Sequence, residues 1–120
     1  MIPGRPPRAP WPAAALCLLA APALAQPEAV PDEATLALGR EVFLETAEPA
    51  CAVYHALADA GAAGEIGPDL DALAPEAARA HAAVSGGVGV MPAYGEALAP
   101  EQIDAVAAYV ASVAGAAEAE

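Results

Sequence analysis

The amino-acid sequence predicts an all-α fold made of a few short helices. Apolar residues recur at three- and four-residue steps in two segments, at about 32–48 and 100–114, and this spacing places them on one face of a helix. No run of residues shows the alternation that is typical of strands. Glycine and proline interrupt the chain between the helical segments, which indicates loops there.

The first 25 residues are expected to be a signal peptide and not part of the fold. Two arginines are followed by an apolar run at 13–21 and by the small-residue cleavage site Ala23-Leu24-Ala25. We therefore expect residues 1–25 to be removed on export to the periplasm, which leaves residues 26–120 as one domain. No later segment reaches 18 residues without a charge, so no membrane span is expected.

The first helix of this domain is predicted to begin after Asp32, whose side chain can cap it, and to end before Pro49. Its inner face is expected to contain Leu36, either Gly39 or Arg40, Phe43 and Ala47. A glycine inside a helix costs about 1 kcal/mol relative to alanine. Gly39 therefore indicates that another backbone passes close to the helix.

Residues 64–70 are predicted to form a loop with a fixed turn, and the nearby carboxylates of Asp69 and Asp71 are expected to be solvated. A second helix is predicted to begin with Pro75, whose missing N–H is no loss in a first turn, and to run to about Ser85.

Three glycines between residues 86 and 89 predict an irregular loop that carries Met91-Pro92. The last helix is predicted to run from Pro100 to about Ala114. Its apolar face is expected to contain Ile103, Val106, Tyr109 or Val110, and Val113.

The charge of the domain is strongly negative. Residues 26–120 contain two arginines and all sixteen acidic residues of the chain, which gives a net charge of −14. Such a domain has almost nothing to neutralise phosphates, so nucleic acid is excluded as a partner. The charge favours either a partner protein with a basic docking face or a plain solvated surface.

The domain keeps a single cysteine, Cys51, because Cys17 lies in the predicted signal peptide. An exported chain with one cysteine cannot close an internal disulfide. The thiol is then an intermolecular bridge, a free reactive group or the site of another covalent bond.

Cys51-Ala52-Val53-Tyr54-His55 reads as a haem-attachment motif that lacks one of its two cysteines. The usual pattern is C-x-x-C-H, and here Tyr54 occupies the second cysteine position. A cysteine followed four residues later by a histidine on a short helical turn can bond a porphyrin edge and ligate its iron.

With its surroundings, this motif resembles a small class I cytochrome c over residues 36–113. The resemblance rests on residues in the order and approximate spacing of that family: Gly39, Phe43, Cys51, His55, Gly67-Pro68-Asp69-Leu70, Met91-Pro92 and Tyr109. It implies a small cytochrome c-like helical fold around one haem, with the first and last helices crossing beside Gly39.

The resemblance also implies the roles of four site residues. Cys51 corresponds to the cysteine that bonds a haem vinyl group, and His55 to the proximal iron ligand. Met91 corresponds to the opposite axial ligand. Pro68 corresponds to the residue whose carbonyl accepts the other N–H of the proximal imidazole and so fixes the ring. A hydrogen bond of Tyr94 near the haem edge is expected, and His81 is a rival axial ligand.

Tyr54 leaves three interpretations open. Haem c is held through a single thioether at Cys51 together with its two axial bonds. Alternatively, haem binds weakly or not at all, and the protein is a haem-deficient interaction module. In the third interpretation Tyr54 is a sequence error or a chance change, since cysteine and tyrosine codons differ by one base.

The resemblance predicts a periplasmic c-type cytochrome that transfers one electron at a time. It would be a free carrier or the haem subunit of a dehydrogenase, including a sulfite-oxidising one, and not itself an enzyme. A peroxidase is disfavoured because Met91 would block the iron.

Overall fold

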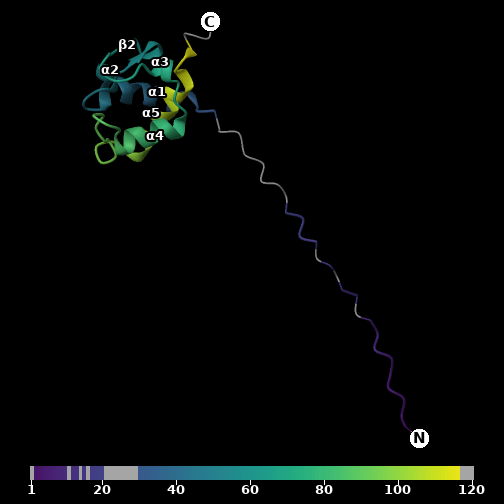
Figure 1. Ribbon diagram of the computed structural model, residues 1–120. Helices are drawn as coiled ribbons and strands as arrows, with labels where there is room; N and C mark the ends of the chain where they lie inside the picture. The colour runs from purple at the N-terminus through teal and green to yellow at the C-terminus, as the bar shows by residue number, and fades with distance from the viewer. Residues whose placement is uncertain (1, 11, 14, 16, 21–29, 117–120) are drawn as a thin grey trace.

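The computed structural model describes residues 2–10, 12–13, 15, 17–20 and 30–116. The expected cleavage site Ala23-Leu24-Ala25 lies outside the described residues. The described residues before residue 21 form no helix or strand, and the folded part begins at the first helix (Figure 1). Within the described ranges, no helix is both long enough and apolar enough to cross a membrane.

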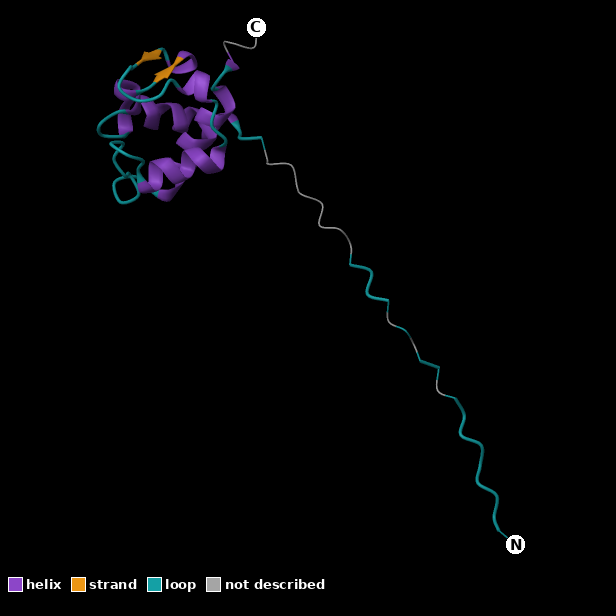
Figure 2. Cartoon of the chain, viewed as in Figure 1, coloured by secondary structure: helices purple, strands orange, loops and turns teal. Residues whose placement is uncertain are grey.

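The folded part is mainly helical, with one small sheet at its edge (Figure 2). In chain order its elements are α1 (Glu33–Glu41), the π-helix η1 (Val42–Thr46), α2 (Cys51–Tyr54), β1 (Ala56–Leu57), the 3-10 helix η2 (Ala58–Ala60), β2 (Ala62–Ala63), α3 (Leu70–Leu73), α4 (Ala77–Gly86) and α5 (Pro100–Val113).

The first helix begins where the sequence predicts. The carboxylate of Asp32 accepts the backbone N–H of Thr35 at 2.8 Å, which satisfies one of the free donors at the helix start. The helix then continues as η1, so the predicted helix is a regular segment followed by a wider turn. The sequence left open whether Gly39 or Arg40 lies on the inner face of this helix. Gly39 is buried and Arg40 is exposed, so the inner face contains Gly39.

Gly39 lies where α1 crosses α5, and these two helices form the most extensive contact between elements. A Cβ atom added at Gly39 would overlap the Ala105 carbonyl oxygen and would lie 2.5 Å from the Cβ of Tyr109. The ring of Tyr109 meets the ring of Phe43 edge to face, with centroids 6.3 Å apart. The crossing that the resemblance implies is therefore present, and it depends on a residue without a side chain.

We predict that Gly39→Ala destabilises the domain, although helix propensity alone would predict a gain of about 1 kcal/mol. The added methyl group has no space between the helices, and overpacking of this kind costs about 1–3 kcal/mol. Because the clash is with backbone atoms, we expect a cost at the upper end of this range, which exceeds the propensity gain by about 2 kcal/mol. Thermal unfolding followed by circular dichroism should then show a melting temperature lower by roughly 8–16 °C. A melting temperature equal to or above that of the wild type would show that the crossing has room for a methyl group.

The prediction of an all-α fold misses a short hairpin. β1 and β2 pair antiparallel, with Ala56 opposite Ala63 and Leu57 opposite Ala62. Each strand has only two residues, and most of these residues are alanine. No alternation of apolar and polar residues could develop over that length, so the sequence carried no strand signal.

α3 begins at the last residue of the predicted loop and lies before the predicted second helix, in a stretch for which no element was expected. It is a single helical turn capped by the carboxylate of Asp69. The expectation that Asp71 is solvated is wrong. Its carboxylate is buried and accepts the backbone N–H groups of Ala58 at 2.8 Å and Gly115 at 2.9 Å. Asp71 thus ties the hairpin region to the end of α5, since a buried carboxylate is stabilised by such hydrogen bonds.

The two remaining helices follow their predicted segments. α4 begins at Ala77, two residues after Pro75, and α5 spans Pro100–Val113. α5 packs against both α1 and α4. α4 lies on the side of the domain opposite α2 (Figure 1), and the space between them is the cavity described next.

Candidate haem site

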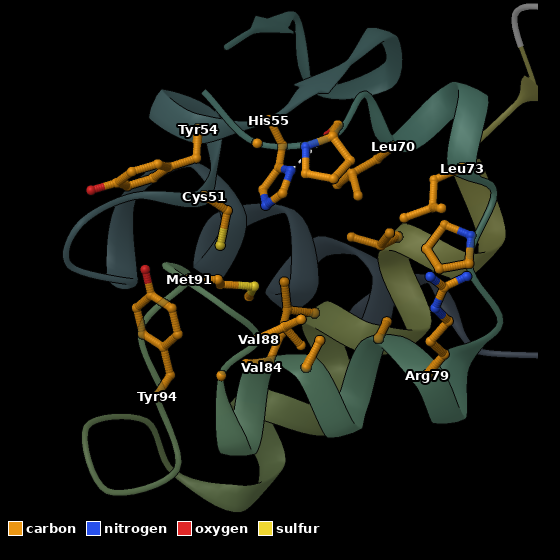
Figure 3. Close-up of a pocket in the computed structure, with 18 of the residues that line it drawn as sticks. Cys51, Tyr54, His55, Leu70, Leu73, Arg79, Val84, Val88, Met91 and Tyr94 are labelled. Carbon is orange, nitrogen blue, oxygen red and sulfur yellow. Dashed lines mark hydrogen bonds between the residues drawn. The ribbon is translucent and has the colours of Figure 1, made fainter. Parts of the chain in front are cut away.

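A largely apolar cavity of about 570 Å³ lies between α2 and α4 (Figure 3). This volume is in the range of sites that enclose a small molecule or cofactor. All four residues that the resemblance assigns to a haem site, Cys51, His55, Pro68 and Met91, line it. Apolar side chains from the rest of the domain complete the wall: Phe43, Ile66, Leu70, Leu73, Val84, Val88, Val90, Val106 and Val110.

Cys51 is the first residue of α2, and its side chain points into the cavity (Figure 3). The residue is 8% exposed, and burial raises the pKa of its thiol to about 11. A thiol that is buried and protonated is a poor candidate for an intermolecular disulfide or for a freely reactive group. Of the three roles open for the lone cysteine, a covalent bond to a group inside the cavity fits its surroundings best.

We predict that the Cys51 thiol of the haem-free protein reacts slowly with iodoacetamide at pH 8. Only the thiolate reacts, and a rise of the pKa from 9.0 to about 11 lowers the thiolate fraction about 100-fold below pH 9. Alkylation followed by mass spectrometry should therefore accelerate as the pH approaches 11. The protein unfolded in guanidinium chloride serves as the control, and equal rates in both states at pH 8 would show that burial does not suppress the thiolate.

His55 follows α2, and its backbone N–H donates to the Cys51 carbonyl at 2.9 Å. Its ring atom Nδ1 lies 2.7 Å from the carbonyl oxygen of Pro68. A carbonyl oxygen only accepts hydrogen bonds, so Nδ1 carries a proton, and in the neutral imidazole Nε2 then keeps its lone pair. The ring points into the cavity (Figure 3), which leaves Nε2 available to a metal ion there.

Gly67 lies directly against the imidazole of His55, a contact that the sequence analysis did not assign. A Cβ added at this position would lie 2.6 Å from Cε1 of His55 and 2.9 Å from its Nδ1. The backbone N–H of Gly67 donates to the Tyr54 carbonyl at 2.7 Å, which fixes the loop against α2. The signal in the sequence was the glycine directly before Pro68, which predicted a turn but not what the turn contacts.

Met91 lies in the predicted glycine-rich loop and is half-buried against the cavity. Its backbone pairs with Val88 in a tight turn, and the carbonyl of Met91 approaches Gly87, where a Cβ would lie 2.7 Å from that oxygen. Gly87 also has a φ of 74°, a conformation that favours glycine. The loop can therefore approach the cavity closely and present the thioether of Met91 to it (Figure 3).

His81, the rival axial ligand, does not line the cavity. It lies on the outer side of α4, where its Nε2 is 3.0 Å from a carboxylate oxygen of Asp104 on α5. In the part of the chain that the structure describes, no three side chains from histidine, cysteine, aspartate and glutamate are grouped as a metal site.

Comparison with known proteins identifies the family. No family model and no curated protein matches the chain. A solved structure does match, the c-type cytochrome SorU from Sinorhizobium meliloti, with 58% sequence identity and a TM-score of 0.68. The match covers 70% of this chain and 95% of that one. The chain belongs to the c-type cytochromes.

The cavity of this cytochrome fits the haem c that the family implies. A buried thiol, an imidazole with one free nitrogen and a thioether line one apolar space, and these are groups that attach and ligate haem. Tyr54 departs from the family pattern, because a phenol cannot form the second thioether bond. It lies at the edge of the cavity, and its ring points away from the His55 imidazole (Figure 3).

Arg79 and Tyr94 lie at opposite ends of the cavity (Figure 3). Arg79 is on α4 and is the only arginine or lysine among the described residues of the cavity wall. Tyr94 is buried, and its hydroxyl donates to the Pro49 carbonyl at 2.6 Å. Burial raises the pKa of Tyr94, so the hydroxyl stays protonated and able to donate.

Proposed function

We propose that this cytochrome carries one electron at a time through a single haem c, attached by Cys51 and ligated by His55 and Met91. The observation that carries the proposal is the convergence of these three side chains on one apolar cavity in a member of the c-type cytochromes. When bound, haem iron with an imidazole and a thioether ligand takes up and releases one electron without an open coordination position. The protein would be an electron-transfer protein and not an enzyme.

The residues around the cavity would each have a defined role. The Pro68 carbonyl holds the proton of His55 on Nδ1, so that Nε2 stays free for the iron. Met91 would occupy the opposite side and exclude small ligands, and its sulfur would raise the reduction potential. The guanidinium group of Arg79 would bind the acidic substituents of the porphyrin at the end of the cavity away from Tyr94.

Attachment would proceed through Cys51 alone. No second thiol is present in residues 26–120, so one thioether is the maximum that this chain can form. A single covalent bond together with two axial bonds still prevents loss of the cofactor by simple dissociation. The haem-deficient interaction module remains the rival function, and it would require that the cavity bind no haem.

Export and docking follow from the same proposal. Residues 1–25 would direct the chain to the periplasm and be removed there.

The acidic domain would dock on a basic face of its redox partner. Three exposed apolar residues of the cavity wall, Ile66, Val88 and Val90, would form the centre of that contact.

If this cytochrome is a free carrier, its partner would be a soluble acceptor. If it is a haem subunit, its partner would be a dehydrogenase. The resemblance in the sequence implies a sulfite-oxidising dehydrogenase among the latter. Mixing the oxidised cytochrome with sulfite and a molybdenum sulfite dehydrogenase tests this choice, because only a matching pair should reduce the haem rapidly at low ionic strength. Slow reduction would favour the free carrier.

The central test is the visible spectrum of the protein exported to a periplasm that contains the haem-maturation machinery. We expect one haem per chain that remains with the protein after acid–acetone extraction. Each vinyl group converted to a thioether shortens the conjugated system, so the α-band of the reduced pyridine complex should fall between those of haem with two thioethers and with none. Folded protein that is colourless and does not respond to added haem would support the interaction module.

A further inference from the structure

The hydroxyl group of Tyr94 connects two parts of the chain that face each other at one end of the cavity. It donates to the carbonyl oxygen of Pro49 at 2.6 Å, across 45 positions of sequence. Pro49 lies two residues before Cys51, and Tyr94 lies three residues after Met91. The hydrogen bond therefore joins the segment that carries the thiol to the loop that carries the thioether.

This bond differs from the other hydrogen bonds of the Met91 loop. In the described part of the chain, those bonds stay between residues 83 and 103, such as Tyr94 N–H to the Val84 carbonyl and Met91 N–H to the Val88 carbonyl. They shape the loop and attach it to α4 and α5. They do not connect it to the wall that carries Cys51.

The loop contains both buried and exposed residues. Val90 is 95% exposed, whereas Tyr94 is 3% exposed and Leu98 is 6% exposed. Met91 therefore lies between an exposed neighbour, Val90, and a buried anchor, Tyr94. A loop of this kind opens locally at a low free-energy cost unless buried contacts hold it.

We propose that Tyr94 is a positioning residue whose hydroxyl holds the Met91 loop against the Cys51 wall and so limits how often the Met91 sulfur leaves the iron. The inference rests on the proposed axial role of Met91. The ring of Tyr94 fills the core, and the hydroxyl supplies the link between the walls. Tyr94→Phe keeps the ring and removes the link, so it isolates this function.

The experiment measures the replacement of Met91 by imidazole in the haem-loaded protein. The sulfur-to-iron charge-transfer band of the ferric form reports the Met91 bond, and its loss after mixing with imidazole gives the rate and the affinity. A buried hydrogen bond contributes a modest net free energy, so we expect imidazole to bind about three- to tenfold faster and more tightly in Tyr94→Phe. Met91→Ala, in which the position is open, sets the upper limit of the rate.

Tyr109→Phe is the matched control. Tyr109 is buried to the same degree, and its hydroxyl donates to the Asp59 carboxylate at 2.5 Å, across 50 positions of sequence and away from the Met91 loop. We expect it to lower the melting temperature but to leave imidazole binding unchanged. Equal acceleration in both variants, or no acceleration in Tyr94→Phe, would overturn the proposal.

A second measurement separates this proposal from the proposed function. Amide hydrogen exchange of Met91 and Gly95 requires no iron bond, and it should be about three- to tenfold faster in Tyr94→Phe than in Tyr109→Phe. Unchanged exchange at these amides would exclude the positioning role. A wild-type protein that lacks the charge-transfer band would instead contradict the axial assignment of Met91, whatever the exchange rates show.

Discussion

Cys51→Ala is expected to abolish covalent attachment of haem to this cytochrome. Cys51 is the only thiol in residues 26–120, and its side chain lines the cavity beside His55. Without it, haem would be held by axial bonds and apolar contacts alone. Acid–acetone should then remove all of the haem from the variant and none from the wild type, as measured by the colour of the two phases and by haem staining of a denaturing gel.

Two further variants make this result specific. Cys17→Ala removes the cysteine of the predicted signal peptide and should leave attachment unchanged. Tyr54→Cys restores the usual motif and should add a second thioether, so that the reduced α-band of the pyridine complex moves to shorter wavelength. Haem that stays bound to denatured Cys51→Ala would mean that another residue forms the covalent bond.

Local rules in the sequence predicted much of the helical framework. Asp32 caps α1 by accepting a free N–H of the first turn, and Pro100 begins α5 because it has no N–H to leave unpaired there. Gly39 predicted a close approach of another backbone, and that approach is the crossing of α1 and α5. The resemblance supplied the pairing of these helices, which periodicity alone could not, since an apolar face does not identify its partner.

The features that the sequence could not predict depend on contacts between distant residues. Asp71 is buried because the N–H groups of Ala58 and Gly115 meet there, and neither residue has a side chain that signals this. The hydrogen bond from Tyr94 to Pro49 joins two loops in the same way. Four residues of the candidate site could be named from their motifs, whereas their shared cavity and the place of Arg79 at its end required the fold.

Gly67→Ala is expected to weaken the bond between His55 and the haem iron. The new methyl carbon would lie 2.6 Å from Cε1 and 3.2 Å from Nε2 of the ring, much closer than the 3.5–4.0 Å of an ordinary carbon contact. The ring must turn or the loop must move, and either change disturbs the Nδ1 contact with the Pro68 carbonyl. Because loss of such an orienting partner typically weakens metal binding roughly 10- to 100-fold, haem content and the low-spin spectrum should both decline.

Gly86→Ala provides the matched control, since a Cβ at Gly86 meets no atom within 4 Å and the residue ends α4 on the opposite wall. It should retain the wild-type spectrum and gain a few tenths of a kcal/mol in stability from its helix propensity. If Gly67→Ala keeps the wild-type spectrum and haem content, the loop yields to the methyl group, and the orientation of His55 depends on Pro68 alone.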